Sequence, residues 1–283
     1  MRRVAIVTDS ASDLPPETAA ASGIVVVPLV ISFGTDTYKA GTELPTDEFW
    51  RRMTAPEAPF PTTAASSPGD FKAAYDKAFA DGAEAIVSIH VAGSLSGTLK
   101  AVEIARGMLP DREIHVVDSG SASMGEGILA QMAAEMADMG VSASEIARIL
   151  TDRASDIDLY VALDTLEYLK KGGRISGPQA AIGTLLSVKP IITIRDGAVH
   201  TADKPRTTGK ARSRVIELLT QRPVERLAVL YTPPADGETF RREVVDRLGE
   251  SIDAASVSLQ PVGASVGPHL GPGCIGGVIL YKR

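Results

Sequence analysis

The chain has 283 residues, of which 44% are hydrophobic and 23% are charged, and its formal net charge is −6. This length exceeds what one hydrophobic core usually organises, so two domains are expected, and the composition is that of an ordinary soluble globular protein. Nucleic-acid binding requires clustered positive charge against phosphates, so no nucleic-acid partner is expected.

A single cysteine, Cys274, excludes an internal disulfide and fits a reducing compartment. The N-terminal apolar run turns polar too early for a signal peptide. No segment approaches the roughly 20 apolar residues that a membrane span needs. We therefore expect a cytoplasmic protein without stable membrane insertion.

Short apolar runs alternate with amphipathic patterns through the first half of the chain. The strands expected here are residues 4–7, 24–27, 85–89 and 114–117, with a hairpin over 30–38. The expected helices include residues 16–21, 127–139 and 143–154, and two whose apolar faces are formed by Phe71, Ala74, Tyr75 and Ala78 and by Ala101, Val102, Ala105 and Met108. A further stripe of Ile128, Met132, Met136 and Met139 is expected to pack in the core. Buried strands alternating with helices predict a parallel sheet covered on both faces.

The second half is expected to be mixed α/β. Its predicted strands are residues 159–163, 190–194, 198–202, 227–231, 256–259 and 278–281, and its predicted helices are 210–219 and 238–248. Arg195-Asp196-Gly197 joins two of these strands and is a strong hairpin signal, which requires antiparallel pairing. The predicted fold is therefore α/β with two domains, an N-terminal domain over residues 1–155 and a smaller C-terminal domain over 156–283.

Several sources of catalytic chemistry are missing. The sequence has neither a P-loop nor a G-x-G-x-x-G that opens a helix after the first strand. Residues 93–97, GSLSG, resemble a nucleophile elbow but have Leu95 where the nucleophilic serine is required. The four histidines show no metal-ligand spacing, and one cysteine cannot build a zinc site. We expect no metal, no cofactor and no self-contained catalysis.

Small hydroxyl residues and glycines recur where predicted strands end or helices begin. They occupy residues 8–13 (TDSASD), 61–71 (PTTAASSPGDF), 92–98 (AGSLSGT) and 118–127 (DSGSASMGEG). Each loop alone is explained by helix capping. Together they indicate an oxyanion site, because ligands of parallel sheets bind beyond the carboxyl ends of the strands. The absence of a phosphate-binding lysine favours a carboxylate over a nucleotide.

Three further features have both an ordinary and a functional interpretation. Arg174 follows a helix stop at Gly172-Gly173 and is either a surface arginine or a site residue. His269 lies in a loop rich in glycine and proline, where a histidine is usually solvated. The basic run over residues 204–214, which includes Arg206, is either a solvated helix face or a docking site for an acidic partner or phosphate.

Seven motifs, in order and spacing, resemble those of the DegV family over essentially the whole chain. They are VTDSASDLP, PTTAASSPGDF, GSLSGT, VVDSGSASMGEG, YLKKGGRIS, KPIITIRDG and GPHLGPGCIG. The resemblance implies an N-terminal α/β/α sandwich, a smaller α/β domain, and one long-chain fatty acid in an apolar tunnel. It also implies a role as the fatty-acid-binding subunit of a two-component kinase. A separate ATP-binding kinase subunit would convert the bound acid to acyl phosphate.

The resemblance also suggests site residues by position. Thr63 and Ser96 resemble the hydroxyl donors to the fatty acid carboxylate, and the ligand candidates further include Gly97, Ser119 and His269. Arg174, Arg206 and His269 resemble residues needed for productive work with the kinase. Ala64-Ala65 and Ala92-Gly93 depart from the family pattern by removing polar groups near the expected head-group site. The alternatives are a passive lipid carrier or sensor without a kinase partner, and a stand-alone enzyme acting on a small phosphorylated substrate.

Overall fold

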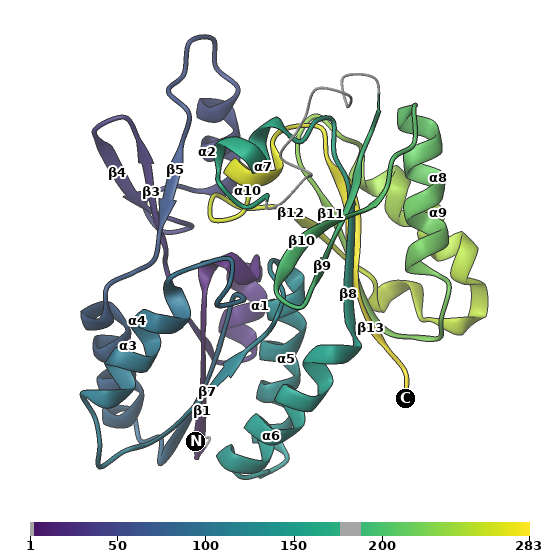
Figure 1. Cartoon of the computed structure of the whole chain (residues 1–283). Helices are drawn as coiled ribbons and strands as arrows, with labels where there is room; N and C mark the ends of the chain where they lie inside the picture. Colours follow the sequence, from purple (N-terminus) through teal and green to yellow (C-terminus); the bar gives the residue numbers. More distant parts are fainter. Residues whose placement is uncertain (1–2, 176–187) are drawn as a thin grey trace.

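The computed structural model describes residues 3–175 and 188–283 and contains three β-sheets (Figure 1). The first half of the chain forms a four-stranded sheet and a small three-stranded sheet. The second half forms a six-stranded sheet. The motif YLKKGGRIS ends at Ser176, which lies outside the described residues.

The four-stranded sheet is parallel throughout, as the alternation of strands and helices predicts. Its order is β2-β1-β6-β7. The strands are β1 (Val4–Asp9), β2 (Ile24–Val27), β6 (Ala85–His90) and β7 (Glu113–Asp118). Every residue of β6 is buried, which is expected of a central strand covered on both faces.

Helices cover both faces of this sheet, so the N-terminal half has three layers. One face packs against α3 (Pro68–Ala80) and α4 (Thr98–Gly107). The other packs against α1 (Pro16–Ala21), α5 (Met124–Asp138) and α6 (Ala143–Arg153). The predicted apolar faces of α3 and α4 are buried, except that Ala74 is half-buried and Met108, just past the end of α4, is 50% exposed.

The stripe predicted for α5 packs in the core only in part, with Ile128 in the core cluster and Met132 and Met136 packed against it. Ile128 is buried, but Met132 and Met136 are half-buried and Met139 is 73% exposed. The face that packs in the core is formed instead by small residues, among them Ala130, Ala133, Ala134 and Ala137. Small side chains allow α5 to approach a sheet on each side.

The small sheet confirms the predicted hairpin and adds a strand that was not predicted. β3 (Val30–Phe33) and β4 (Asp36–Lys39) form the hairpin, and β5 (Thr62–Ala64) pairs with the free edge of β3. Helix α2 (Thr46–Met53) follows β4 and buries Phe49 and Trp50. This sheet positions Thr63.

The six-stranded sheet is mixed, with the order β10-β9-β8-β13-β11-β12. Only the pair β11–β12 is parallel. The strands are β8 (Ile157–Ala162), β9 (Ile191–Arg195), β10 (Ala198–Asp203), β11 (Val224–Tyr231), β12 (Ser258–Pro261) and β13 (Ile275–Tyr281). The predicted β9–β10 hairpin is present, and Asp196 and Gly197 take φ values of 50° and 71°, as a type I′ turn requires.

Helices α8 (Thr208–Leu219) and α9 (Gly237–Leu248) cover the outer face of this sheet (Figure 1). Two short helices, α7 (Glu167–Lys171) and α10 (Gly267–Leu270), pack against each other at one end of it. The sequence predicted an irregular loop around His269, but the structure has a helical turn there. Short 3₁₀ turns occur elsewhere, among them η1 (Ser10–Ser12) and η2 (Ala154–Asp156).

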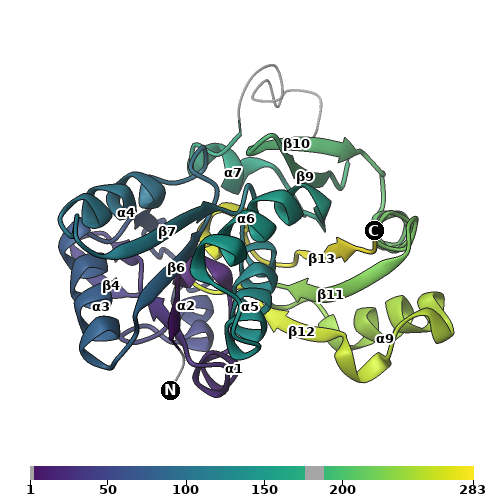
Figure 2. The ribbon, with the colours of Figure 1, turned by 90° about the horizontal axis from the view of Figure 1, so that it is seen from below.

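Helix α5 lies between the two larger sheets (Figure 2). Its contacts with β1 and β13 join apolar residues from the facing sides of both sheets in one hydrophobic cluster. The chain passes from α6 through η2 into β8, and the predicted boundary at residues 155/156 falls in this passage and stays a prediction. Among the described residues, none of the helices has the length and apolar character of a bilayer span.

Candidate ligand pocket

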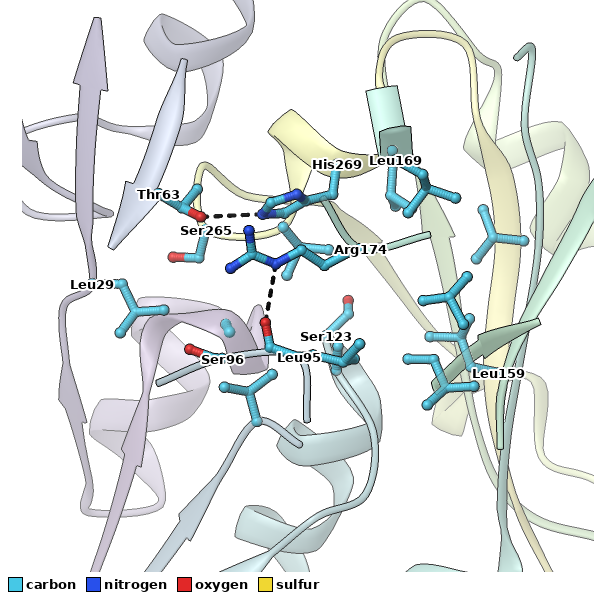
Figure 3. A pocket seen from close by; sticks show the side chains of 18 of the residues that line it. Leu29, Thr63, Leu95, Ser96, Ser123, Leu159, Leu169, Arg174, Ser265 and His269 are labelled. Atoms are coloured by element: carbon cyan, nitrogen blue, oxygen red, sulfur yellow. Dashed lines mark hydrogen bonds between the residues drawn. The ribbon is translucent and has the colours of Figure 1, made fainter. Parts of the chain in front are cut away.

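A pocket lies between the loops at the carboxyl ends of β1, β6 and β7 and the inner face of the six-stranded sheet (Figure 3). It contains about 860 Å³ of empty space, its open mouth included. The sheet contributes only aliphatic side chains, which are Leu159, Val161, Ile192, Ile194, Val199 and Leu230. These residues form a wall without hydrogen-bonding side chains, suited to a hydrocarbon chain.

Polar side chains lie mainly at the opposite side of the pocket. Six of the 23 lining residues have polar side chains, namely Thr63, Ser96, Ser123, Arg174, Ser265 and His269. Thr63, Ser96, Ser265, Arg174 and His269 lie near one another in Figure 3, away from Leu159. Among the described residues that line the pocket, Arg174 is a cation and none is a carboxylate. The electrostatics at this end therefore favour an anion.

His269 contacts Thr63 across the pocket. The Nε2 atom of His269 lies 3.1 Å from the Thr63 hydroxyl, and Nδ1 is buried without a partner. Burial, with a further contribution from the positive charge of Arg174, lowers the pKa of His269 to about 4. The ring is therefore neutral at neutral pH, and it can donate one hydrogen bond and accept another.

Arg174 lies on the loop that follows α7, as the glycine stop at residues 172–173 predicts. Its Nε donates to the Leu95 carbonyl oxygen at 3.0 Å, and its Nη1 donates to the Gly172 carbonyl oxygen at 2.5 Å. These two bonds fix the plane of the guanidinium. Its Nη2 has no hydrogen-bond partner within the described residues, so donors remain available to a ligand.

Ser96 and Gly97 lie where the chain enters α4. Gly97 is the N-cap residue and supplies no side-chain cap. The Ser96 hydroxyl oxygen accepts a hydrogen bond from the Thr98 backbone N–H at 3.2 Å, and it lies 2.8 Å from the Thr98 hydroxyl. Ser96 therefore supports the helix start and also lines the pocket, so the capping and ligand interpretations are both compatible with its position.

Two serines of the pocket, Ser123 and Ser265, were not singled out from the sequence. Ser265 lies four residues before His269, on the helical turn that leads into α10, and its hydroxyl is 2.8 Å from that of Ser10. Ser10 in turn accepts a hydrogen bond from the Leu29 N–H. Ser123 donates to Asp13 at 2.5 Å. Both lie in hydroxyl-rich or glycine-rich segments, and this composition is the only feature of the sequence that points to them as pocket residues.

These geometries agree with comparisons with known proteins. A family model described as "Uncharacterised protein, DegV family" matches residues 3–282. The chain belongs to the DegV family. The DegV domain-containing protein of Streptomyces coelicolor is 35% identical over 286 residues, covering 99% of each chain. Protein DegV of Bacillus subtilis is 31% identical over 284 residues, again covering 99% of each.

Solved DegV structures have the same two-domain mixed α/β fold, which confirms the predicted fold class. A fatty-acid-binding DegV family protein from Thermus thermophilus superposes with a TM-score of 0.88 at 33% identity, covering 99% of this chain and 100% of that one. DegV from Bacillus subtilis, described as a fatty acid binding protein, gives 0.84 at 30% identity and covers both chains completely.

The pocket brings together five of the seven residues suggested by the DegV motifs. Thr63, Ser96, Gly97, Arg174 and His269 line it. Ala64 and Ala65 line it as well, so the departures from the motif at these positions leave methyl groups at the polar end.

Ser119 and Arg206 do not line the pocket. Ser119 is buried, and its hydroxyl bonds to the Ser121 backbone within the turn. The Ser121 backbone satisfies this hydroxyl, so Ser119 stabilises the turn and does not line the pocket. Arg206 is exposed on the loop before α8. A role for Arg206 in an interaction with a kinase subunit stays a prediction.

Proposed function

We propose that this DegV-family chain binds a long-chain fatty acid in the pocket, with the carboxylate at the end formed by Thr63, Ser96 and Arg174. The observation that carries the proposal is the division of one pocket into an aliphatic wall and a polar end that contains a cation and no acid. The fatty acid binding described for the Thermus thermophilus and Bacillus subtilis proteins supports this choice of ligand.

The apolar wall accounts for strong retention of such a ligand. Burying about 14 methylenes at ~0.8 kcal/mol each contributes on the order of 11 kcal/mol before the entropy of association is subtracted. Hydrogen bonds to the charged carboxylate add roughly 1.5–3 kcal/mol each and orient the acid. A ligand held in this way is expected to survive purification.

Native mass spectrometry of the purified protein tests this proposal. We expect a population heavier by one fatty acid, whose acyl chain is then identified after solvent extraction. Ala65→Trp introduces a large ring at the polar end and is expected to abolish the adduct, whereas Ala55→Trp, at an exposed position, serves as the matched control. A wild-type protein that shows only the apo mass, and that takes up no added fatty acid, would contradict the proposal.

We further propose that the chain presents the bound carboxylate to a separate ATP-binding kinase subunit, which forms acyl phosphate. The DegV motifs suggest this role, and the sequence lacks a nucleotide-binding motif of its own. Phosphoryl transfer to a carboxylate depends on positioning and on neutralising the charge around the transferred group. Arg174 and His269 lie at the polar end of the pocket, and the exposed Arg206 is available to contact a partner.

Alanine variants at Arg174, Arg206 and His269 test this second step. We expect acyl phosphate formation with a cognate kinase subunit to fall by about tenfold or more in each variant. Fatty acid affinity should persist in Arg206→Ala and His269→Ala, whereas Arg174→Ala, which removes a cation from the carboxylate end, should also weaken binding, so its phosphorylation is compared at saturating fatty acid. Arg247→Ala, at another exposed arginine, is the control. Wild-type rates in all three variants would contradict the assigned roles. A wild-type protein that no such subunit phosphorylates would favour the passive carrier or sensor.

A further inference from the structure

Beneath the pocket lies a buried polar cluster that fatty acid binding does not use. It consists of Asp9 at the end of β1, His90 at the end of β6 and Glu126 in the first turn of α5. All three are completely buried, and their Nδ1, Nε2 or carboxylate atoms lie within 4.8 Å of one another. The cluster is not recognisable from the sequence, because its members come from three distant segments.

Hydrogen-bond donors surround the Asp9 carboxylate. The backbone N–H of Ala11 donates to Oδ1 at 2.8 Å, and the backbone N–H of Val91 donates to Oδ2 at 3.4 Å. The Nδ1 atom of His90 lies 2.9 Å from Oδ2. Asp9 is therefore well suited to carry a full negative charge inside the protein.

Glu126 has a different environment. Its Oε1 accepts hydrogen bonds from the Thr8 hydroxyl at 2.6 Å and from the Asp9 backbone N–H at 3.2 Å. Its Oε2 is buried and has no donor as a partner. A second charged carboxylate here would lie beside that of Asp9 with one oxygen unsolvated, which is strongly unfavourable. Burial and the Asp9 charge raise the pKa of Glu126 well above its ordinary value.

Ser88 contacts this cluster and completes a serine–histidine–aspartate arrangement with His90 and Asp9. This arrangement is not a nucleophilic site. Ser88 lies 2.6 Å from His90 Nε2, and His90 Nδ1 contacts Asp9. The Ser88 hydroxyl is completely buried and bonds to the Tyr75 hydroxyl at 2.8 Å, on the side of the sheet covered by α3. No substrate reaches this oxygen, so the role of the cluster is positional.

We propose that Glu126 carries a proton that it donates to the Asp9 carboxylate, and that this neutral acid positions the floor of the fatty acid pocket. The proton supplies the missing partner of Oε2 and leaves the pair with one negative charge, which the N-terminus of α5 favours. The expected effect on fatty acid affinity rests on the proposed function. The shared proton does not depend on that function.

The Asp9 carboxylate holds two segments that line the pocket. It accepts hydrogen bonds from the backbone N–H groups of Ala11 and Val91, and both residues line the pocket. Ser123, another lining residue, is the N-cap of α5, so a shift of this helix would move it as well. Ionisation of Glu126 would set two carboxylates against each other and push α5 away from β1. This displacement of α5 is expected to lower the affinity for the fatty acid.

Other titratable groups lie near this pair. Tyr75 contacts it through Ser88, and Asp13, which follows η1, receives a hydrogen bond from Ser123. Burial raises the pKa of Asp13 to about 7, so Asp13 also contributes stability that is lost as the pH rises through neutrality. On the side of α5 that faces the six-stranded sheet, Arg226 pairs with Glu135, at the far end of the helix. In the native state Glu126 keeps a proton that the unfolded chain loses above its ordinary pKa. Stability from Glu126 is therefore complete below that pKa and is lost as the pH rises through the raised value.

Infrared spectroscopy and a pair of variants test the inference. We expect the wild-type protein at neutral pH to show the C=O stretch of protonated carboxyls. Asp13→Asn removes the contribution of Asp13, and adding Glu126→Gln should remove the band that remains. The glutamine amide mimics the neutral acid, so Glu126→Gln should fold, bind fatty acid within about threefold of the wild type and show a smaller alkaline decrease in melting temperature than the wild type. Glu126→Ala should lose affinity by about tenfold or more. Glu135→Gln, on the same helix, is the control.

Specific outcomes would overturn the inference. One is a wild-type spectrum without the protonated carboxyl band, and another is a Glu126→Gln variant that keeps the wild-type pH profile. A stoichiometric metal ion in the purified protein, with a melting temperature that falls on chelation, would show that a cation rather than a proton neutralises the cluster. If the wild type binds no fatty acid but shows the band, the proposed function fails while the shared proton stands.

Discussion

At the scale of single residues, Ser96 shows how one hydroxyl can serve the fold and the ligand. Its oxygen accepts from the Thr98 N–H, which stabilises the start of α4. The same side chain lines the polar end of the pocket. When the Thr98 hydroxyl donates to Ser96, the Ser96 O–H is free to donate a hydrogen bond to a carboxylate while its oxygen still accepts from the Thr98 N–H, so the two roles do not compete.

Replacing Ser96 with alanine should therefore affect binding more than folding. Loss of a hydrogen bond to a charged oxygen costs roughly 1.5–3 kcal/mol, so fatty acid affinity should fall about ten- to hundredfold. The free energy of unfolding of the ligand-free protein should fall by about 1 kcal/mol or less. Calorimetric binding and denaturant unfolding measure the two effects.

Ser67→Ala is the matched control for Ser96→Ala. Ser67 caps α3 through a reciprocal capping box with Asp70, and it does not line the pocket. Its replacement should lower stability by about 1 kcal/mol and leave affinity unchanged. If Ser96→Ala behaves in the same way, Ser96 is a helix cap and does not contact the ligand.

Residues of the site were predictable only where a motif located them. Thr63, Arg174 and His269 were suggested by position within the DegV motifs, and all three line the pocket. Ser119 and Ser265 show the limit of this approach, since hydroxyl-rich turns do not reveal which side chains point outward. The orientation of such a side chain depends on whether its hydroxyl already forms hydrogen bonds with the backbone of the turn, as the Ser119 hydroxyl does with the backbone of Ser121.

At the scale of elements, the packing of α7 against α10 decides where His269 lies. Gly172 follows the last residue of α7, and a Cβ atom there would lie 2.1 Å from the Nδ1 of His269. Its backbone φ of −76° is open to any residue, so glycine is needed here for space alone. The close approach explains why Nδ1 is buried without a partner.

Gly172→Ala should therefore displace His269 without straining the backbone at residue 172. We expect the hydrogen bond between His269 and Thr63 to break, with a loss of about 1–3 kcal/mol in the free energy of unfolding from overpacking. The NMR shifts of the His269 ring report the displacement. Gly209→Ala, where an added Cβ meets nothing within 4 Å, is the control. An unchanged His269 spectrum in Gly172→Ala would contradict this account.

Most elements were predictable because their periodicity is strong. The parallel strands and the β9–β10 hairpin follow from apolar runs and one turn dipeptide. β5 and α10 were missed because three residues of edge strand and one turn rich in glycine and proline have no periodicity. The methionines of α5 are less buried than predicted for another reason. A helix between two sheets buries its small residues, and sequence alone does not show that a second sheet lies on its far side.

At the scale of the whole molecule, both halves share one apolar cluster. It contains residues of β1 and β6 as well as residues of β8, β11 and β13. The single tryptophan, Trp50, belongs to α2, yet its Nε1–H donates to the Val262 carbonyl oxygen of the C-terminal half at 2.8 Å. Unfolding one half would expose the apolar face of the other, so the two halves should unfold together.

We therefore expect a single unfolding transition that a fatty acid shifts as a whole. Trp50 fluorescence reports the junction between the halves and far-UV circular dichroism reports all elements, so the two denaturant curves should coincide. A ligand at about 100 times its Kd should raise the free energy of unfolding by about 2.7 kcal/mol, and both probes should show this shift equally. Ala65→Trp, whose pocket is filled, should show no shift by circular dichroism, which is the probe for this variant because it contains a second tryptophan. Two separated transitions, only one of them moved by the fatty acid, would mean that the ligand is held by one half alone and that the shared core does not couple the halves.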